Sequence, residues 1–308
     1  MRLPDEYGTD EFWNAYRAAM AGPAPPAPGK AKGGTLRWLL DEYRRSSEWA
    51  SLANATRRQR ENIYKHVMEG AGSEPFADID RATIAAGRDR RKDTPAAARN
   101  FLEAMRGLFR WALEAGHVAA DPTAGIKSAK LRTDGFHAWT EAEIAQYEAR
   151  WPLGTRERLA FDVLLYTGLR RGDAVRAGPA MVAGGILSIR TEKTGRDLSL
   201  PILAALRASL EAGPIGTSTW IAGERRKPLT KESFGTWFKI ACKAAGLPHC
   251  SAHGLRKAGA TRAANSGATV AQLEAIFGWD GGGMASLYTR KADRERLARE
   301  AMDKLEKR

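Results

Sequence analysis

SAHGLRKAGATRAANSGATVAQLEAIFGWDGGGMASLYTRKAD, residues 251–293, carries three kinds of side chain suited to phosphate chemistry. His253 and Arg256 stand three positions apart and therefore share one face of a helix. The planar guanidinium of Arg256 suits a phosphate because it donates two hydrogen bonds at once. A Gly-Trp pair ends at Trp279, whose indole N–H is a donor, and Tyr288 comes nine residues later. A deprotonated Tyr can attack phosphorus, so the stretch combines donors suited to a phosphate with a candidate nucleophile.

The order, spacing and residue types of these groups resemble the C-terminal half of the active site of tyrosine recombinases, the phage integrase family. That family has a His-x-x-Arg helix, a second His or Trp after a Gly, and then a Tyr nucleophile. The resemblance implies that His253, Arg256 and Trp279 are catalytic and that Tyr288 is the nucleophile. Trp279 departs from the commoner His; because it cannot transfer a proton, it serves hydrogen bonding or packing.

The resemblance also implies a fold class. This is mainly α with a small antiparallel β-sheet, in which an N-terminal four-helix (SAM-like) core-binding domain precedes a C-terminal tyrosine-recombinase catalytic domain. The resemblance covers roughly residues 35–307, nearly the whole chain.

The segment TGLRRGD, residues 167–173, supplies another arginine and an acidic side chain. Gly168 permits a tight turn, so Arg170 is expected at the start of the next helix, with Asp173 three residues later. TGLR followed by an acidic residue resembles the first signature of the family, which implies that Arg170 is the first catalytic arginine and that Asp173 orients it. Lys193 stands in a Lys-Thr-Gly turn like the hairpin that carries the family's mobile lysine. Without the resemblance, a solvated hairpin lysine would be the ordinary interpretation.

The chemistry that the resemblance implies is the cutting and rejoining of DNA through a 3′-phosphotyrosine. Two arginines stabilise the charge of the pentacovalent transition state. Ionising a Tyr at pH 7 costs about 4 kcal/mol because its ordinary pKa is near 10; His253 can take the proton, and Lys193 can protonate the leaving 5′-oxygen. No metal, cofactor or ATP is expected, because side chains supply the cations and the phosphotyrosine retains the bond energy. Strand exchange between two duplexes implies a homotetramer on DNA.

Composition and charge agree with a nucleic-acid partner but do not select one. The 308 residues carry a formal charge of +13 with a pI of about 9.9, so DNA, RNA or an anionic membrane would each be attracted. Two cysteines make neither a disulfide framework nor a Cys-x-x-Cys metal pair. No apolar run approaches the ~18 residues of a membrane span, and the N-terminus lacks the regions of a signal peptide. We therefore expect a cytoplasmic protein that associates with the nucleoid when it acts.

Composition shifts predict four parts. Residues 1–33 are an extension with a short helix at 11–20 and an Ala/Pro/Gly-rich linker. Residues 34–126 form a helical core DNA-binding domain, and 127–139 a basic interdomain linker. Residues 140–308 form the catalytic domain with its C-terminal helix.

In the first domain, helices are expected at about 35–46, 56–69, 80–91 and 94–115, with Thr35 and Thr94 as N-caps. Basic residues cluster on the second helix and at the end of the third. Charge runs are usually solvated faces, but the resemblance implies phosphate contacts for both clusters and for a later basic patch. The candidates are Arg57, Arg58, Arg60, Lys65, Arg88, Arg90, Arg91, Lys92, Arg225, Arg226 and Lys227.

In the second domain, Thr140 and Glu143 form a capping box. Helices are expected at about 155–166, 202–212, 230–245 and 269–277, with strands at 186–190 and 197–201. Glycines 281–283 are interpreted as a flexible hinge before the Tyr288 segment. A separate amphipathic helix is expected at 293–307, which family members often pass to a neighbouring subunit.

A metal site is not predicted. His249, Cys250 and His253 are close in sequence, but no third and fourth ligand stands nearby. His137, in the connector, is interpreted as structural or incidental.

Four functional hypotheses stay open. A site-specific recombinase of a phage or other mobile element agrees with all six catalytic positions being filled. A type IB topoisomerase-like nicking enzyme would share the chemistry, but the separate helical domain argues against it. An inactive DNA-binding protein would be expected to have a broken catalytic set. A Xer-type resolvase stands within the family, and the N-terminal segment and Trp279 favour a mobile element over it.

Overall fold

The computed structural model describes residues 9, 11–13, 33–129, 135–223 and 225–306. Beyond residue 290 in the last helix, side chains are described at 294, 296, 298, 299 and 302–306. The helix expected at 11–20 and the linker before residue 33 therefore lie largely outside the described residues. The chain divides into two compact units, residues 1–133 and 134–308. Within the described ranges, every helix is too short or too polar to cross a lipid bilayer.

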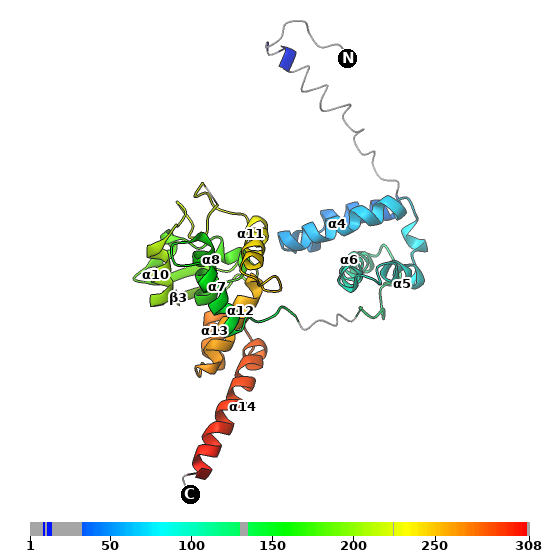
Figure 1. The fold of residues 1–308 in the computed structure, drawn as a ribbon. Coiled ribbons are helices and arrows are strands. Elements are labelled where there is room, and N and C mark those ends of the chain that lie inside the picture. Colours follow the sequence, from blue (N-terminus) through cyan, green and yellow to red (C-terminus); the bar gives the residue numbers. More distant parts are fainter. Residues whose placement is uncertain (1–8, 10, 14–32, 130–134, 224, 307–308) are drawn as a thin grey trace. The chain divides into compact units, whose positions relative to one another are not determined.

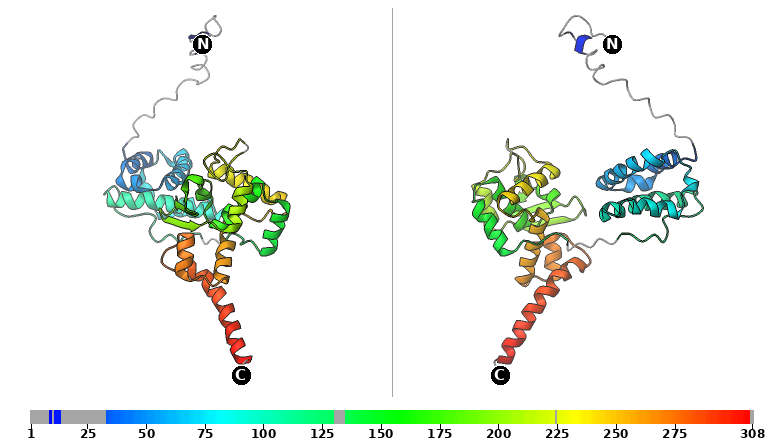
Figure 2. Two further views of the ribbon diagram at one scale, coloured as in Figure 1. Left: turned by 90° about the vertical axis from the view of Figure 1, so that its left-hand side faces the viewer. Right: turned by 45° about the vertical axis from the view of Figure 1, so that its right-hand side comes forward.

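The described part of the first unit is helical (Figures 1 and 2). Its elements are α2 (Leu36–Arg45), α3 (Ser47–Ser51), α4 (Asn54–Ala71), the 3-10 turn η1 (Phe76–Asp78), α5 (Arg81–Asp89) and α6 (Pro95–Glu114). The four expected helices are present with ends within about two residues. The five-residue α3 was not expected, because it is too short to show a hydrophobic period.

Caps and apolar stripes account for this unit. The Thr35 side chain accepts a hydrogen bond from the Trp38 amide and begins α2 as expected. The long helix α6 packs against α2, α4 and α5, and the Tyr64 hydroxyl donates to the Ala104 carbonyl at 2.7 Å to join α4 to α6. The predicted stripes of α2 and α6 are buried as expected, namely Leu36, Leu39, Leu40, Tyr43, Phe101, Met105, Leu108 and Ala112.

The second unit combines helices with one small sheet (Figure 1). Its helices are α7 (Glu141–Arg150), α8 (Arg156–Thr167), α9 (Arg171–Ala174), the 3-10 turn η2 (Pro179–Met181), α10 (Ala204–Ala212), α11 (Lys231–Ala244), α12 (Ala252–Asn265), α13 (Val270–Phe277) and α14 (Gly283–Glu306). Its strands are β1 (Val182–Ala183), β2 (Ile186–Arg190) and β3 (Asp197–Pro201). The protein is thus mainly helical with a small antiparallel sheet, as the sequence predicted.

The sheet is antiparallel in the order β1-β2-β3. Strands β2 and β3 pair from Ile186 with Pro201 to Arg190 with Asp197, so their connecting turn presents Lys193. Both strands alternate exposed and buried residues, as the sequence period predicted. The two-residue β1 was not expected, since two residues carry no period.

Helix α8 is central to the core of the second unit. It contacts α9, α10, α11 and α12, and its Leu159, Val163 and Leu164 are buried. The end of the connector also packs into this core: Trp139 is 4% exposed, and its indole N–H donates to the Ser251 carbonyl at 2.9 Å. This hydrogen bond joins the connector to the N-cap of α12, although the two residues are 112 positions apart in the sequence.

The expectation of a separate final helix from Asp293 is wrong. Helix α14 already begins at Gly283 and carries Tyr288 on its second turn. Gly281 and Gly282, both with φ of +73°, form the turn that precedes it, a conformation that glycine adopts without steric cost. The early turns of α14 are stabilised because Ala285 and Thr289 are buried, with α14 packed against α12 and α13.

Candidate active site

A cavity of about 640 Å³ in the second unit brings together side chains from separate segments of the chain. Arg170, Lys193, His253 and Arg256 all line it. Three further cations line the same cavity, Arg171, Lys231 and Lys239, against the two carboxylates of Asp173 and Glu192. The excess of positive charge suits an anionic ligand.

Arg256 is the most buried cation of this site, at 5% exposed. Its two terminal nitrogens donate to the carbonyls of Gly168 and Phe277. These carbonyls belong to the C-terminal ends of α8 and α13, where orphan acceptors attract a cation. Burial, followed by the neighbouring charge of Arg170, lowers the pKa of Arg256 to about 10, so it stays charged at pH 7.

Arg170 is the N-cap of α9, immediately after the left-handed turn at Gly168, whose φ is +60°. Its Nη1 is buried and has no hydrogen-bond partner among the described residues. Buried donors are almost always satisfied. A buried orphan donor, close enough to Arg256 to lower that group's pKa, indicates a place for an anion.

Asp173 does not orient Arg170 through a side-chain hydrogen bond in the described structure. Its buried carboxylate accepts from Arg176 Nη2 and from the Glu192 amide, both at 2.7 Å. The second contact holds the start of the β2–β3 turn, next to Lys193. Asp173 therefore positions the hairpin that presents the lysine. Lys193 itself is exposed and makes no ion pair with any described residue.

His253 lies in the first turn of α12 at the cavity edge. The Phe136 ring lies over it, with centroids 4.7 Å apart, and the Lys257 ammonium donates to the Phe136 carbonyl at 2.6 Å. Burial lowers the pKa of His253, and the nearby cations, Arg256 first among them, lower it further. Its imidazole is therefore neutral near pH 7 and able to accept a proton. The role of Phe136 has no signal in the sequence pattern.

Trp279 and Tyr288 stack beside Arg256. Their rings are 5.3 Å apart at 10°, and the Arg256 guanidinium lies 5.6 Å from the Trp279 ring centroid. Tyr288 is half-buried; burial raises the pKa of its phenol, and Arg256 opposes that rise. An ion pair from Arg196, after the Lys193 turn, to Asp280 joins the hairpin to the loop that follows Trp279. Four of the six candidate side chains therefore line one basic cavity, whereas Trp279 and Tyr288 are not among its lining residues and connect to it through Arg256, which lies over Trp279.

The sequence of residues 140–295 matches the family model described as "Phage integrase family". The chain belongs to the phage integrase family. It is 27% identical over 226 residues to the integrase of Escherichia phage HK022, an alignment that covers 69% of this chain and 63% of that protein. It is 28% identical to the tyrosine recombinase XerD of Ralstonia nicotianae, covering 86% of this chain and 87% of that protein.

Among solved structures, a lambda integrase dimer bound to a COC′ core site matches with a TM-score of 0.73 at 25% identity. That match covers 83% of this chain and 95% of the compared one. The fold thus matches that of an integrase, whereas the chain spans less than two thirds of the phage integrase of HK022.

In this phage integrase family member, the expected DNA contacts fall into two groups. Five of the eleven are engaged within the chain: Arg57 with Asn54, Arg60 with the Tyr43 hydroxyl, Arg88 with Asp89 and the Lys127 carbonyl, Arg91 with the Gly87 carbonyl and the Phe101 ring, and Arg226 with the Ile215 carbonyl. The other six are exposed and make no ion pair with any described residue: Arg58, Lys65, Arg90, Lys92, Arg225 and Lys227.

The expectation that no further ligand lies near His249 and Cys250 is wrong. His137 and Glu143 lie beside them, and the donor atoms of all four are within 4.8 Å of one another. His253 is not part of this group. The sequence could not show the cluster, since its members are up to 113 positions apart and only folding brings them together.

Proposed function

We propose that this chain is a site-specific DNA recombinase that cuts and rejoins DNA through a 3′-phosphotyrosine at Tyr288. The observation that carries the proposal is the convergence of Arg170, Lys193, His253 and Arg256 on one cavity, with Tyr288 stacked on the Trp279 ring over which the Arg256 guanidinium lies. The orphan donor of Arg170 supports an anionic substrate there.

The reaction begins with in-line attack of the Tyr288 oxygen on the phosphorus. Its proton passes to the neutral His253 imidazole. Arg170 and Arg256, with the Trp279 N–H, stabilise the added charge of the transition state. The bond from phosphorus to the 5′-oxygen breaks, and that oxygen takes a proton from Lys193. A 5′-hydroxyl of a second strand then attacks the phosphotyrosine and releases Tyr288. Each step exchanges one phosphoester for another, so no ATP is needed, and the side chains of Arg170, Arg256 and Lys193 supply the positive charge that a catalytic metal would otherwise provide.

Residues 34–126 form the core-binding domain of the SAM-like, four-helix type, and residues 140–308 form the catalytic domain. Residues 127–139 are the linker between the two domains. The six exposed and unpaired cations named above are the phosphate contacts, because the other five already have partners within the chain. Such contacts position the protein without reading sequence. The protein acts on DNA in the nucleoid of the cytoplasm.

Recombination needs four active sites, so the active species is a tetramer on DNA. Helix α14 supports subunit exchange, because the described side chains on its apolar stripe are uncovered. Met302 is 60% exposed and Leu305 63% exposed, and Ala298 is also exposed. The stripe docks on a neighbouring subunit and couples assembly to cleavage.

Integration and excision of a phage or other mobile element is the role that we assign. A Xer-like resolvase is the second candidate, because the XerD alignment spans 87% of that relative. An experiment in cells that carry both the protein and the DNA flanking its gene distinguishes the integrase from the resolvase. Recovery of a joined element end supports the integrase, whereas resolution of dimeric replicons alone supports the resolvase.

A covalent-adduct assay tests the chemistry. The full chain is incubated with a nicked target site, and protein–DNA adducts are counted on a denaturing gel. The wild type is expected to form an adduct, Tyr288→Phe none, and the control Tyr166→Phe an undiminished amount, since Tyr288 stacks on Trp279 next to Arg256 whereas Tyr166 packs against the apolar core. An adduct that survives Tyr288→Phe would place the nucleophile elsewhere. DNA affinity should fall by about 0.9 log unit per log unit of salt for each neutralised phosphate.

A further inference from the structure

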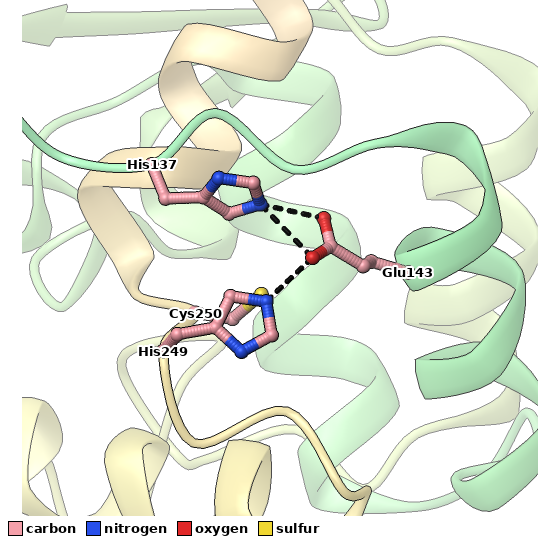
Figure 3. A group of neighbouring side chains, drawn as sticks. All are labelled: His137, Glu143, His249 and Cys250. Carbon is pink, nitrogen blue, oxygen red and sulfur yellow. Dashed lines mark hydrogen bonds and ion pairs between the residues drawn. The ribbon is translucent and has the colours of Figure 1, made fainter.

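Four side chains outside the proposed cleavage chemistry converge at one edge of the second unit (Figure 3). His137 comes from the end of the connector, Glu143 from the first turn of α7, and His249 and Cys250 from the loop before α12. We propose that a divalent cation of the zinc class binds at a tetrahedral site formed by these four side chains: His137, Glu143, His249 and Cys250.

Both imidazoles turn the same nitrogen toward one carboxylate. His137 Nε2 is 2.9 Å and 2.8 Å from the two Glu143 oxygens, and His249 Nε2 is 2.6 Å from Oε1. Figure 3 shows the two rings on either side of this carboxylate, with the Cys250 sulfur beside His249. Two nitrogens, one oxygen and one sulfur are therefore presented to a common centre.

The dimensions suit a small four-coordinate ion. Zinc bonds of about 2.0–2.3 Å place tetrahedral ligand atoms about 3.3–3.8 Å apart. The donor atoms here lie within 4.8 Å of one another, so their largest separation must contract by about 1 Å. The close nitrogen–oxygen pairs must open by about half an ångström. Rotations of the side chains supply both changes.

The donor types select the class of ion. A thiolate with two imidazoles and one carboxylate suits zinc and its close relatives, whereas calcium and magnesium require oxygen ligands. Four protein ligands leave no open position, which is typical of a structural site. Binding replaces the hydrogen bonds of the cluster. The thiol proton of Cys250 is released to solvent, and each imidazole gives up the Nε2 proton that it donates to Glu143 and carries its remaining proton on Nδ1.

The surroundings agree with a built site. The Glu143 carboxylate is fixed by the Thr140 amide at 2.7 Å, a contact of the type that orients metal ligands. Cys250 is 3% exposed, and Glu143 is 15% exposed. The two imidazoles are 40% and 52% exposed and leave an entry path from solvent.

The position gives the ion a structural consequence. Cys250 directly precedes Ser251, the N-cap of α12, and stands three residues before His253. The ion would fasten the connector and α7 to the start of the helix that carries His253 and Arg256.

Cobalt binding tests the site. The full chain without a polyhistidine tag is titrated with Co²⁺, and thiolate-to-cobalt charge transfer is followed in the near ultraviolet. We expect one Co²⁺ per chain, displacement of the band by Zn²⁺, and a rise in Tm of roughly 5–10 °C at a hundredfold excess over the Kd.

Matched variants locate the ion. Cys250→Ser and Cys250→Ala should each abolish the band, because both remove the only sulfur ligand, whereas Cys242→Ala should keep it, because Cys242 is a buried thiol outside the cluster. Glu143→Gln and His249→Ala act on more exposed groups, and each should weaken Co²⁺ binding at least about tenfold. Gln keeps the capping acceptor, so folding is preserved. Absence of Co²⁺ binding, or binding unchanged in Glu143→Gln and His249→Ala, would overturn the proposal.

Discussion

Gly168→Ala tests whether the left-handed turn between α8 and Arg170 is needed for the stability of the fold and for the position of Arg256. Gly168 has φ of +60°, and a Cβ added there would lie 2.3 Å from Phe277 Cε1. The left-handed conformation costs an alanine about 1–2 kcal/mol. Moving the buried Phe277 ring costs about 1–3 kcal/mol more. The free energy of unfolding should therefore fall by about 2–5 kcal/mol.

The same substitution should impair cleavage, because the carbonyls of Gly168 and Phe277 both hold Arg256. A displacement of about 1 Å at a catalytic group can reduce a rate about 100-fold. Gly184→Ala is the matched control: its φ is +57°, but nothing lies within 4 Å of the added Cβ. It should lose only about 1–2 kcal/mol of stability and should cleave at the wild-type rate.

Urea titrations measure the free energy of unfolding of each variant. The initial rate of adduct formation, measured without urea at a temperature where both variants are folded, reports the rate of cleavage. Equal losses of stability in the two variants would refute the clash with Phe277. A wild-type rate of adduct formation in folded Gly168→Ala would refute the coupling to Arg256.

Lys193→Ala should slow cleavage of ordinary DNA about 100-fold or more. A substrate with sulfur in place of the leaving 5′-oxygen should restore the rate, because a thiol with a pKa near 8.5 leaves without a proton donor. If the sulfur substrate does not restore the rate, Lys193 is not the acid. The pKa of His253 in the folded chain lies below its ordinary value of 6.5, so the unfolded chain binds this proton first as the pH falls, and stability is lost from about pH 6.5 downward. Urea titrations from pH 7 to 5 should show that loss in the wild type and a flatter profile in His253→Gln; identical profiles would contradict the pKa shift. The double variant Met302→Asp, Leu305→Asp should change the free energy of unfolding of the monomer by less than about 0.5 kcal/mol, since both side chains are exposed. It should nevertheless reduce tetramer formation on DNA in native gels. Unchanged tetramer formation would count against docking of α14 on a neighbouring subunit.

Local chemistry explains what could be read from the chain. Thr35 and Thr140 begin helices because their hydroxyls accept from amides three residues on, and α2 and α7 start where those caps predict. The period of two in β2 and β3 gave both strands to the residue. The start of α14 was misplaced because glycines 281–283 signal a break in isolation, whereas burial of Ala285 against α12 and α13 stabilises a helix directly after the turn.

The order of Arg170, Lys193, His253, Arg256, Trp279 and Tyr288 is a property of the sequence, and it was sufficient to suggest the chemistry. Their mutual arrangement is a property of the fold. Asp173 holds the amide of Glu192, Arg256 joins the ends of α8 and α13, and the Phe136 ring contacts His253. Likewise, His137 and Glu143 join His249 and Cys250 only in the folded chain. Caps and periods act over three or four residues, whereas these contacts depend on how whole helices pack, a choice made by the shape of the shared core.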